Sequence, residues 1–352
     1  MRSRYWWSVA VLAASVGLAA CGNDDAGDSG DEAGTDTGSP GTDTGGGADA
    51  GAEDDASTTT DTGGGSDAGT EEDTQGAIGG YEACFPEFVE VVGVSIDDLG
   101  MPVAAACEGT VQQNFEGVER VVFLGDSITA GQGGGANGAY RVLLSQRLQE
   151  RYPGVVIDDC SVGGAVNADL LGEQIPNCFD GPEDRRTLVI FTSGGNDVVQ
   201  LAFQEASIEE SIPFIDGFVA ELRDALDFLA DPANTPGGVL VVFANVYEFT
   251  DATGLLSGCP LAAIAGLPAQ WDDGIAAYAY MEEQYAALAA EFGFDVMFLE
   301  ENFCGHGYNR NSPDSPCNDR AGDLWIGADC IHPNVDGHAA IADLFWGIIA
   351  GE

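Results

Sequence analysis

The chain has 352 residues and combines 59 Asp and Glu with 11 Arg and no Lys, giving a formal net charge of −48 at pH 7. Because nucleic acids are polyanions that proteins bind mainly through Lys and Arg, this charge excludes them as partners. When the first 80 residues are set aside, nine Arg remain against 43 acids, a net charge near −34, which also disfavours anionic substrates.

Residues 1–20 have the features of a secretion signal. Arg2 and Arg4 precede a mostly apolar stretch, 5–20, that is shorter than the roughly 20 residues a helix needs to cross a bilayer. The stretch ends in Leu18-Ala19-Ala20-Cys21, a lipobox, so we predict cleavage before Cys21 and lipidation of its thiol. The alternative is that Cys21 belongs to an ordinary signal peptide. The prediction places the protein outside the cytoplasm, lipid-anchored in a bacterial cell envelope, at the outer membrane or cell surface rather than the cytoplasmic membrane.

Residues 21–80 consist mainly of Gly, Asp, Thr, Ala and Ser, with sixteen acids and no basic residue. Such a segment cannot bury a core and its like charges repel, so we predict an extended, disordered tether. The alternative is a calcium-binding array, but the segment contains no EF-hand-like ligand loop. Residues 81–352 are long enough for one domain with a sizeable core, and we expect it to be a monomer.

Within residues 81–352, short apolar runs alternate with amphipathic helical patterns. Such alternation predicts an α/β fold, a three-layer α/β/α sandwich around a central parallel sheet. The predicted strands are 121–124, 154–157, 188–191, 239–243 and 295–299, and the predicted helices are 140–151, 215–229, 273–292 and 337–349. Two long irregular stretches, 250–268 and 302–328, are expected to wall a cleft at the carboxyl ends of the strands.

Eight cysteines fall in this domain, an even number that indicates disulfides in an exported protein. Eight cysteines allow 105 pairings, so proximity in sequence is only a guide, and the pairs we expect are Cys84–Cys107, Cys160–Cys178, Cys304–Cys317 and Cys259–Cys330. Zinc is the competing use, but the paired C-x-x-C spacing of structural zinc sites is absent, so we predict no metal.

Four short motifs lie where the predicted strands end or before the last helix. Gly125-Asp126-Ser127 follows the first strand and continues to Gly131, and Gly163-Gly164 follows the second. Gly194-Gly195-Asn196-Asp197 follows the third, and Asp329 stands three residues before His332 and Pro333. Each motif has a structural alternative, because Asp and Ser cap helices, Gly pairs form turns, and Asn and Asp bind local backbone. Together they offer a hydroxyl, an imidazole and a carboxylate, the groups that nucleophilic acyl transfer requires.

In this order of motifs the chain resembles the SGNH, or GDSL-type, hydrolases over about residues 120–347. The resemblance implies hydrolysis of carboxylic esters with Ser127 as nucleophile, His332 as base and Asp329 as its partner. It also implies an oxyanion hole formed by the Ser127 N–H, the Gly164 N–H and the Asn196 amide, without a cofactor. Gly163 remains the alternative to Gly164, because the second motif departs from the family's common Ser-Gly-Asp form. Asp197 is expected to orient its loop, and His306 and His338 are expected to be structural.

The family includes esterases, lipases, phospholipases, thioesterases and carbohydrate deacetylases. We expect an esterase or lipase that acts on a neutral small-molecule or lipid ester. The alternatives are a carbohydrate O-deacetylase, a phospholipase, or a catalytically silent lipoprotein that binds glycans.

Overall fold

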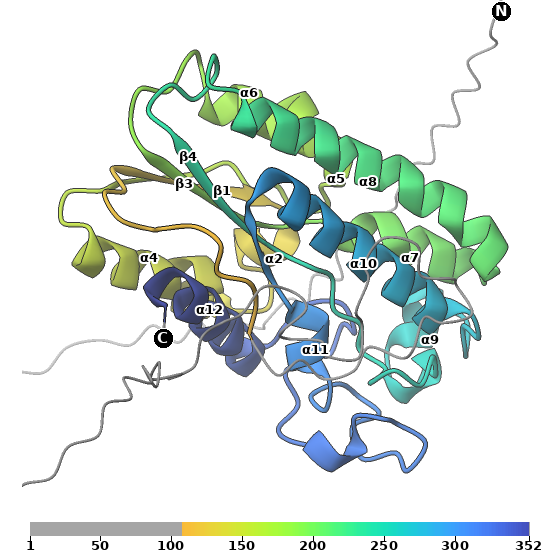
Figure 1. Cartoon of the computed structure of the whole chain (residues 1–352). Helices are drawn as coiled ribbons and strands as arrows, with labels where there is room; N and C mark the ends of the chain where they lie inside the picture. Colours follow the sequence, from red (N-terminus) through yellow and green to blue (C-terminus); the bar gives the residue numbers. More distant parts are fainter. Residues whose placement is uncertain (1–107, 352) are drawn as a thin grey trace, which may run out of the picture. The chain divides into compact units, whose positions relative to one another are not determined.

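The structure of the protein is a computed structural model that describes residues 108–351 (Figure 1). The predicted signal peptide, lipidation site, tether and Cys84–Cys107 bridge lie outside the described residues. Within the described range, no helix combines the length and apolar character needed to cross a bilayer.

Five parallel strands form the central sheet in the order β2-β1-β3-β4-β5. Their bounds are β1 Arg120–Gly125, β2 Val156–Asp159, β3 Thr187–Thr192, β4 Val239–Ala244 and β5 Asp295–Met297. Every residue of β1 and β3 is buried. This burial explains why the central strands are continuous apolar runs rather than alternating patterns, since helices cover both faces of the sheet. The predicted parallel sheet is therefore confirmed.

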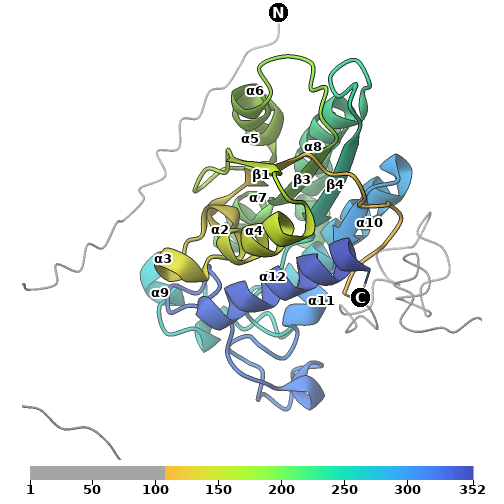
Figure 2. The same ribbon diagram turned by 90° about the vertical axis from the view of Figure 1, so that its left-hand side faces the viewer.

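Side chains alternate between the two faces of the sheet and build two separate cores. Val121 and Phe123 pack with helices α4 (Tyr140–Arg151) and α12 (Val335–Ala350). Val122 and Leu124 pack with α8 (Ile208–Ala230) and α10 (Gly274–Phe292). Figures 1 and 2 show these two helix pairs on opposite sides of the strands. The architecture is thus the predicted three-layer sandwich.

Shorter helices connect these elements. They are α2 Ser127–Ala130, α3 Gly135–Gly138, α5 Asn167–Asp169, the π-helix η2 Leu170–Gln174, α6 Ile175–Cys178, α7 Gly195–Gln204, the 3-10 helix η3 Leu256–Gly258, α9 Ala262–Ala265, α11 Leu299–Phe303 and the 3-10 helix η4 Asn318–Arg320.

Most predicted boundaries differ from the observed ones by one or more residues, and three of these differences have a local cause. The strand predicted at 295–299 ends at Met297, because the Asn245 side chain accepts the N–H groups of Leu299 and Glu300 and begins α11 there. The strand predicted from residue 154 begins at Val156, since Gly154 has a positive φ of 89°. Helix α8 begins at Ile208, seven residues before the predicted 215, because Ser207 and Glu210 form a capping box.

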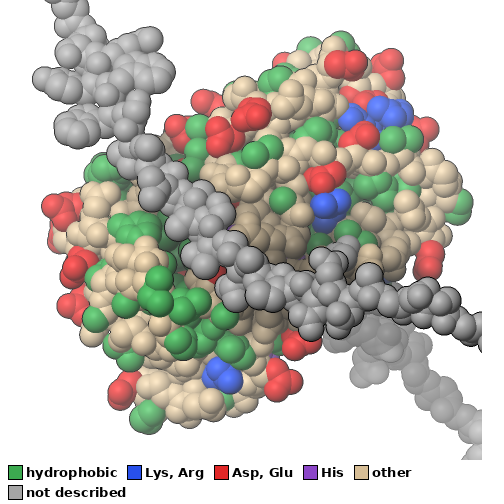
Figure 3. Space-filling view, turned by 180° about the vertical axis from the view of Figure 1, so that it is seen from behind, with side chains coloured by type: hydrophobic (Ala, Val, Ile, Leu, Met, Phe, Trp, Pro, Cys, Tyr) green, Lys and Arg blue, Asp and Glu red, His purple; other side chains and the backbone are tan. Residues whose placement is uncertain are grey.

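Three disulfides join the described cysteines in the pairs that the sequence favoured, Cys160–Cys178, Cys259–Cys330 and Cys304–Cys317. Acidic side chains are spread over the face shown in Figure 3, with few arginines among them.

Candidate active site

Ser127 lies in a tight turn where β1 passes into α2. Gly125 closes the strand with a φ of 110°, and a Cβ there would lie 2.1 Å from the Thr192 carbonyl oxygen at the end of β3. Only glycine permits this approach. Asp126, not Ser127, caps the helix, because its carboxylate accepts the Ile128 N–H at 3.0 Å. The capping role is therefore filled by a neighbour, and the Ser127 hydroxyl makes a different contact.

That contact is with His332, 205 residues further along the chain. The Ser127 Oγ lies 2.7 Å from the His332 Nε2, and the His332 Nδ1 lies 2.7 Å from an Asp329 carboxylate oxygen. The other Asp329 oxygen accepts the backbone N–H groups of Ile331 and His332 at 3.1 and 3.0 Å. Ser127 and His332 are 7% and 8% exposed. The structure thus brings the three predicted residues into one chain of hydrogen bonds.

The charge of Asp329 fixes the orientation of the imidazole. Burial raises the pKa of this carboxyl, but hydrogen bonds from the His332 ring and from two backbone N–H groups outweigh burial and hold the pKa at about 2. The carboxylate therefore stays ionised and accepts a hydrogen bond from the Nδ1–H of the imidazole. The Nε2 is left to accept the hydrogen bond of the Ser127 hydroxyl.

Asp126 is a second carboxyl beside this chain. It is buried, and its carboxylate accepts the Thr192 hydroxyl at 2.8 Å in addition to the Ile128 N–H. Burial raises its pKa to about 6, although these two hydrogen bonds and the nearby His332 act in the opposite direction. Its hydrogen bonds tie the start of α2 to the end of β3, which holds Ser127 in place.

Asn196 stands in the first turn of α7, directly after β3, and lines the same pocket as Ser127. One N–H of its side chain is donated to the Ala165 carbonyl at 2.8 Å, which fixes the orientation of the amide. Asp197 accepts the Asn167 N–H at 3.1 Å and so ties α7 to α5, as its predicted loop-orienting role requires. Burial raises the pKa of Asp197 to about 7.

Gly163 and Gly164 lie in the loop after β2, beside the nucleophile turn. A Cβ at Gly163 would lie 3.9 Å from the Cβ of Ser127, while Gly164 has a φ of 84° that disfavours any other residue. Within the described part of the chain, neither backbone N–H donates a hydrogen bond. Both candidates for an oxyanion donor therefore stand at the site.

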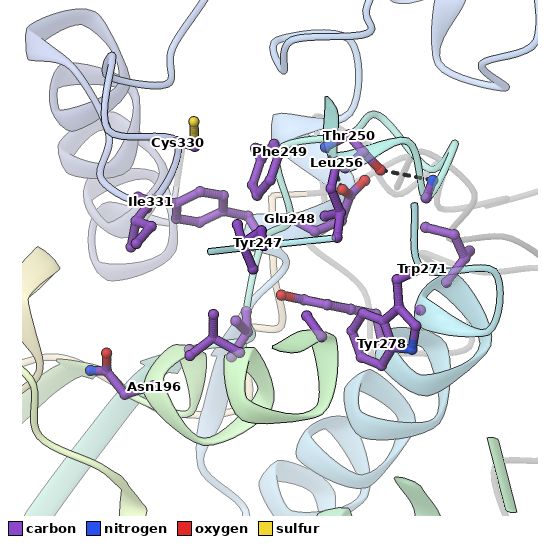
Figure 4. Close-up of a pocket in the computed structure, with 18 of the residues that line it drawn as sticks. Asn196, Tyr247, Glu248, Phe249, Thr250, Leu256, Trp271, Tyr278, Cys330 and Ile331 are labelled. Carbon is purple, nitrogen blue, oxygen red and sulfur yellow. Dashed lines mark hydrogen bonds between the residues drawn. The ribbon is translucent and has the colours of Figure 1, made fainter. Parts of the chain in front are cut away.

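A pocket lined mainly by apolar side chains opens from Ser127 and Asn196. Figure 4 shows Trp271 and Tyr278 across the pocket from Asn196. The irregular stretch 250–268 contributes lining residues, as predicted, whereas 302–328 contributes none. The latter segment instead supports the wall from behind, because Phe303 stacks on Tyr247 with ring centroids 4.6 Å apart.

Sequence reasoning missed most of the pocket lining. Tyr247 and Glu248 follow β4, so the rule that reactive groups gather beyond the carboxyl ends of parallel strands could have identified them. Trp271 and Tyr278 belong to no motif. Trp271 lies just before the apolar helix α10, and Tyr278 lies within it. Nothing in their local sequence distinguishes them from core residues.

The other two histidines have structural roles. His306 stacks on Trp325 and its Nδ1 contacts the Asp323 carbonyl at 2.8 Å. His338 is fully buried and its Nε2 contacts the Gln132 carbonyl at 2.8 Å. Among residues 108–351, no group of three or more His, Cys, Asp or Glu side chains is arranged to hold a metal ion.

Comparison with known proteins identifies the family. The model of the GDSL-like lipase/acylhydrolase family matches residues 123–340, and the chain belongs to this family. A search of curated proteins finds no match.

Solved structures with similar folds include an extracellular lipase from Streptomyces rimosus and a phospholipase A1 from Streptomyces albidoflavus. Each is 20% identical over 65% of this chain and 98% of its own, with TM-scores of 0.45 and 0.46. A catalytic mutant of the acetylxylan esterase Axe2 from Geobacillus stearothermophilus is 18% identical over 66% of this chain and 95% of its own, with a TM-score of 0.46.

Proposed function

We propose that the protein is a serine esterase that hydrolyses carboxylic esters through an acyl-enzyme. The observation that carries this proposal is the hydrogen-bonded chain from Ser127 through His332 to Asp329 beside a mainly apolar pocket. Membership of a family of lipases and acylhydrolases supports the same reaction class.

In the first half of the reaction, the Ser127 oxygen attacks the ester carbonyl while its proton passes to the His332 Nε2. The tetrahedral intermediate collapses, the bond to the leaving alcohol breaks, and His332 returns the proton to that alcohol. In the second half, a water molecule attacks the acyl carbon and gives a proton to His332. The bond from the acyl carbon to the Ser127 oxygen then breaks, His332 returns the proton to that oxygen, and the carboxylic acid is released. Asp329, held ionised, stabilises the imidazolium in both halves.

The negative oxygen of each intermediate needs hydrogen-bond donors that are already in place. We assign this role to the Ser127 N–H in the first turn of α2, the Gly164 N–H, and the Asn196 amide. Gly163 is the neighbouring alternative to Gly164. The hydrogen bond from Asn196 to Ala165 supports the assignment of Asn196, because it fixes the amide before substrate arrives.

We also propose that the mature protein is a monomer anchored in the bacterial cell envelope by lipid on Cys21, with residues 22–80 as a spacer. The lipobox and the acidic, core-free segment that follows it support this location. Labelling cells with a radioactive fatty acid tests the anchor: the wild-type protein should be labelled and Cys21→Ser should not.

The reaction is tested with a short p-nitrophenyl ester and a fluorophosphonate probe. Wild-type protein should turn over the ester and be labelled on Ser127, while Ser127→Ala should lose both and keep its melting temperature. Ser145→Ala is a matched control, because Ser145 lies in α4 and its hydroxyl binds the Arg141 carbonyl. Labelling retained by Ser127→Ala would place the nucleophile elsewhere, and a folded wild-type protein without turnover or labelling would favour a silent binding module.

A further inference from the structure

The pocket beside Ser127 is lined by aromatic rings and two acids, Asp126 and Glu248. Tyr247 and Phe249 come from the loop after β4, and Trp271 and Tyr278 pack edge to face with ring centroids 6.3 Å apart (Figure 4). The indole N–H of Trp271 is donated to the Ala206 carbonyl and the Tyr247 hydroxyl to the Ile331 carbonyl. Both polar ends are thus used elsewhere, and carbon surface of the rings faces the pocket.

Glu248 lines the same pocket, and no Lys, Arg or His does. Its carboxylate accepts the backbone N–H groups of Thr250 and Ala252, which fix its position. Three more glutamates lie directly behind it. Glu282 from α10 and Glu300 and Glu301 from α11 are 8%, 3% and 5% exposed.

Among the described residues, none of these four glutamates forms an ion pair. The Glu300 carboxylate accepts the Glu248 N–H at 2.5 Å, and the Glu301 carboxylate accepts the Asn245 amide at 2.8 Å. One Glu282 oxygen accepts the Val246 N–H at 3.2 Å, while the other is buried without a hydrogen-bond partner. An unpartnered buried carboxyl oxygen is unfavourable unless a proton or a cation compensates it.

The pKa shifts of these glutamates also indicate that their charged forms lack a compensating cation. Burial raises the pKa of Glu248 to about 7 and that of Glu282 and Glu300 well above the ordinary range, and neighbouring carboxylates add to each shift. Burial and the charges of these three glutamates also raise the pKa of Tyr278. The carboxyls around Tyr278 therefore hold their protons to a higher pH than usual, and a cation bound beside them would stabilise their charged forms.

We propose that this pocket binds an organic cation, a compact alkylammonium group carried by the ester substrate. Aromatic faces attract such cations through the ring quadrupole, and a weakly hydrated alkylammonium also gains by burying its methyl groups. The four carboxyls are not arranged to hold a metal ion, so a metal fits the site less well. The inference rests on the proposed esterase activity, because it concerns the substrate of the same site.

The test compares two esters of the same shape as substrates of the full mature protein. Butyrylcholine carries a quaternary nitrogen where 3,3-dimethylbutyl butyrate carries a carbon. We expect kcat/KM to be about tenfold higher for the choline ester. Tetramethylammonium chloride should also inhibit hydrolysis of p-nitrophenyl butyrate competitively, and sodium chloride at the same concentration should not.

Substitutions in the pocket test which residues cause the preference for the choline ester. Glu248→Gln and Trp271→Leu should each reduce the ratio of the two kcat/KM values toward one, and the ratio corrects for any general loss of activity. Glu150→Gln is the matched control, because it removes one charge from an exposed position on α4 and should keep the wild-type ratio.

The ratio should also rise between pH 6 and pH 8. Glu248 is mostly protonated below about pH 7 and ionised above it, so its attraction for a cation grows as pH increases. The groups that face it are Asp251 from its own loop, Tyr278 and Glu282 from α10, and Glu300 and Glu301 from α11. Ionisation of the carboxyls among them adds negative charge as well, so the sign is the same, whereas Tyr278 stays neutral in this pH range.

Equal kcat/KM for the two esters, together with no competition by tetramethylammonium in the wild-type protein, would overturn this inference. Hydrolysis of the neutral ester would then still support the proposed function. Loss of both activities would instead count against the esterase itself. A variant that fails to fold is recognised by its melting temperature, and the wild-type competition experiment then decides.

Discussion

Asp126 and Ser127, which are neighbours at the start of α2, have separate roles. Asp126 caps the helix and binds the Thr192 hydroxyl, so Ser127 need not use its own hydroxyl on the backbone. Sequence alone could not separate these roles, since Asp and Ser are both good capping residues. The contact of Ser127 with His332 depends on a residue 205 positions away.

One prediction at the scale of single residues concerns Asn196. Asn196→Ala removes a donor that acts on the negative oxygen of the transition state, so kcat should fall by about 10²–10³ while KM changes little. Steady-state kinetics with a p-nitrophenyl ester measure both constants. The nearby polar residue Gln200, also on α7, gives a control in Gln200→Ala, which should retain wild-type kinetics. A raised KM with unchanged kcat in Asn196→Ala would assign the amide to substrate binding instead.

At the scale of elements, the site is assembled from loops that follow the strands. The loop after β4 supplies much of the pocket wall, and the segment before α12 supplies Asp329 and His332. The Cys259–Cys330 disulfide joins these two loops and spans 71 residues. Cys330 is itself fully buried and lines the pocket.

This link predicts that the two loops need the disulfide for activity as well as for stability. Replacing both cysteines, Cys259→Ala with Cys330→Ala, should lower the free energy of unfolding by about 4 kcal/mol in the chain-entropy model. It should also lower kcat at least about tenfold, because the Asp329–His332 segment loses an anchor. Thermal denaturation and ester kinetics measure the two effects.

The matched control is Cys304→Ala with Cys317→Ala, which opens a bridge spanning 13 residues in a segment that lines no part of the pocket. It should cost about 3 kcal/mol and leave kcat near the wild-type value. Equal losses of kcat in the two double variants would show that the Cys259–Cys330 bridge has no special effect on the site.

At the scale of the whole molecule, acids dominate both the surface and part of the interior. The pKa of several buried carboxyls is raised by burial, to about 6 for Asp126 and about 7 for Asp197 and Glu301. The opposite case is Glu183, whose hydrogen bonds with Arg185 lower its pKa to about 2 against the effect of burial, with Arg120 adding to the shift.

These shifts predict that stability is highest near pH 4 and is already lower at pH 5. Between about pH 4 and 7 the unfolded chain has released protons that the buried carboxyls of the folded state still hold, so stability falls as pH rises. Below about pH 4.5 the contribution of Glu183 is lost as pH falls toward 2. We expect a melting temperature about 5 °C or more lower at pH 8 than at pH 5, measured by calorimetry. Glu301→Gln should reduce this difference, and a melting temperature that rises toward pH 8 would contradict the prediction.

The net charge also bears on substrate choice. With about 34 excess negative charges on residues 81–352, an anionic ester should have a lower kcat/KM than a neutral ester of equal chain length. The difference should shrink as salt is added, because the Debye length falls from about 10 Å at 0.1 M to about 3 Å at 1 M. Matched esters measured across ionic strength test this. A preference for the anionic ester that weakens with salt would point to arginines at the pocket mouth.

The sequence by itself determined the sheet, the layers and the chemical motifs. Continuous apolar runs identify buried strands, because both faces of each strand are covered, and the helical patterns between them require parallel crossovers. Ser127, Asn196, Asp329 and His332 were identifiable because short-range motifs with fixed spacing carry them. The structure confirms three of the expected disulfides. Proximity in sequence suggests Cys160–Cys178 and Cys304–Cys317, but not Cys259–Cys330, which spans 71 residues.

Only the tertiary structure decided the shape and character of the pocket. Trp271, Tyr278 and the buried glutamates stand in apolar helices and irregular loops, where local sequence does not tell a pocket wall from a core. Their roles arise from contacts between elements far apart in the chain, such as that of Asn245 with Glu301. Periodicity and short motifs report which face of an element is buried, whereas a cavity depends on which elements meet there and on how their side chains fill the space between them.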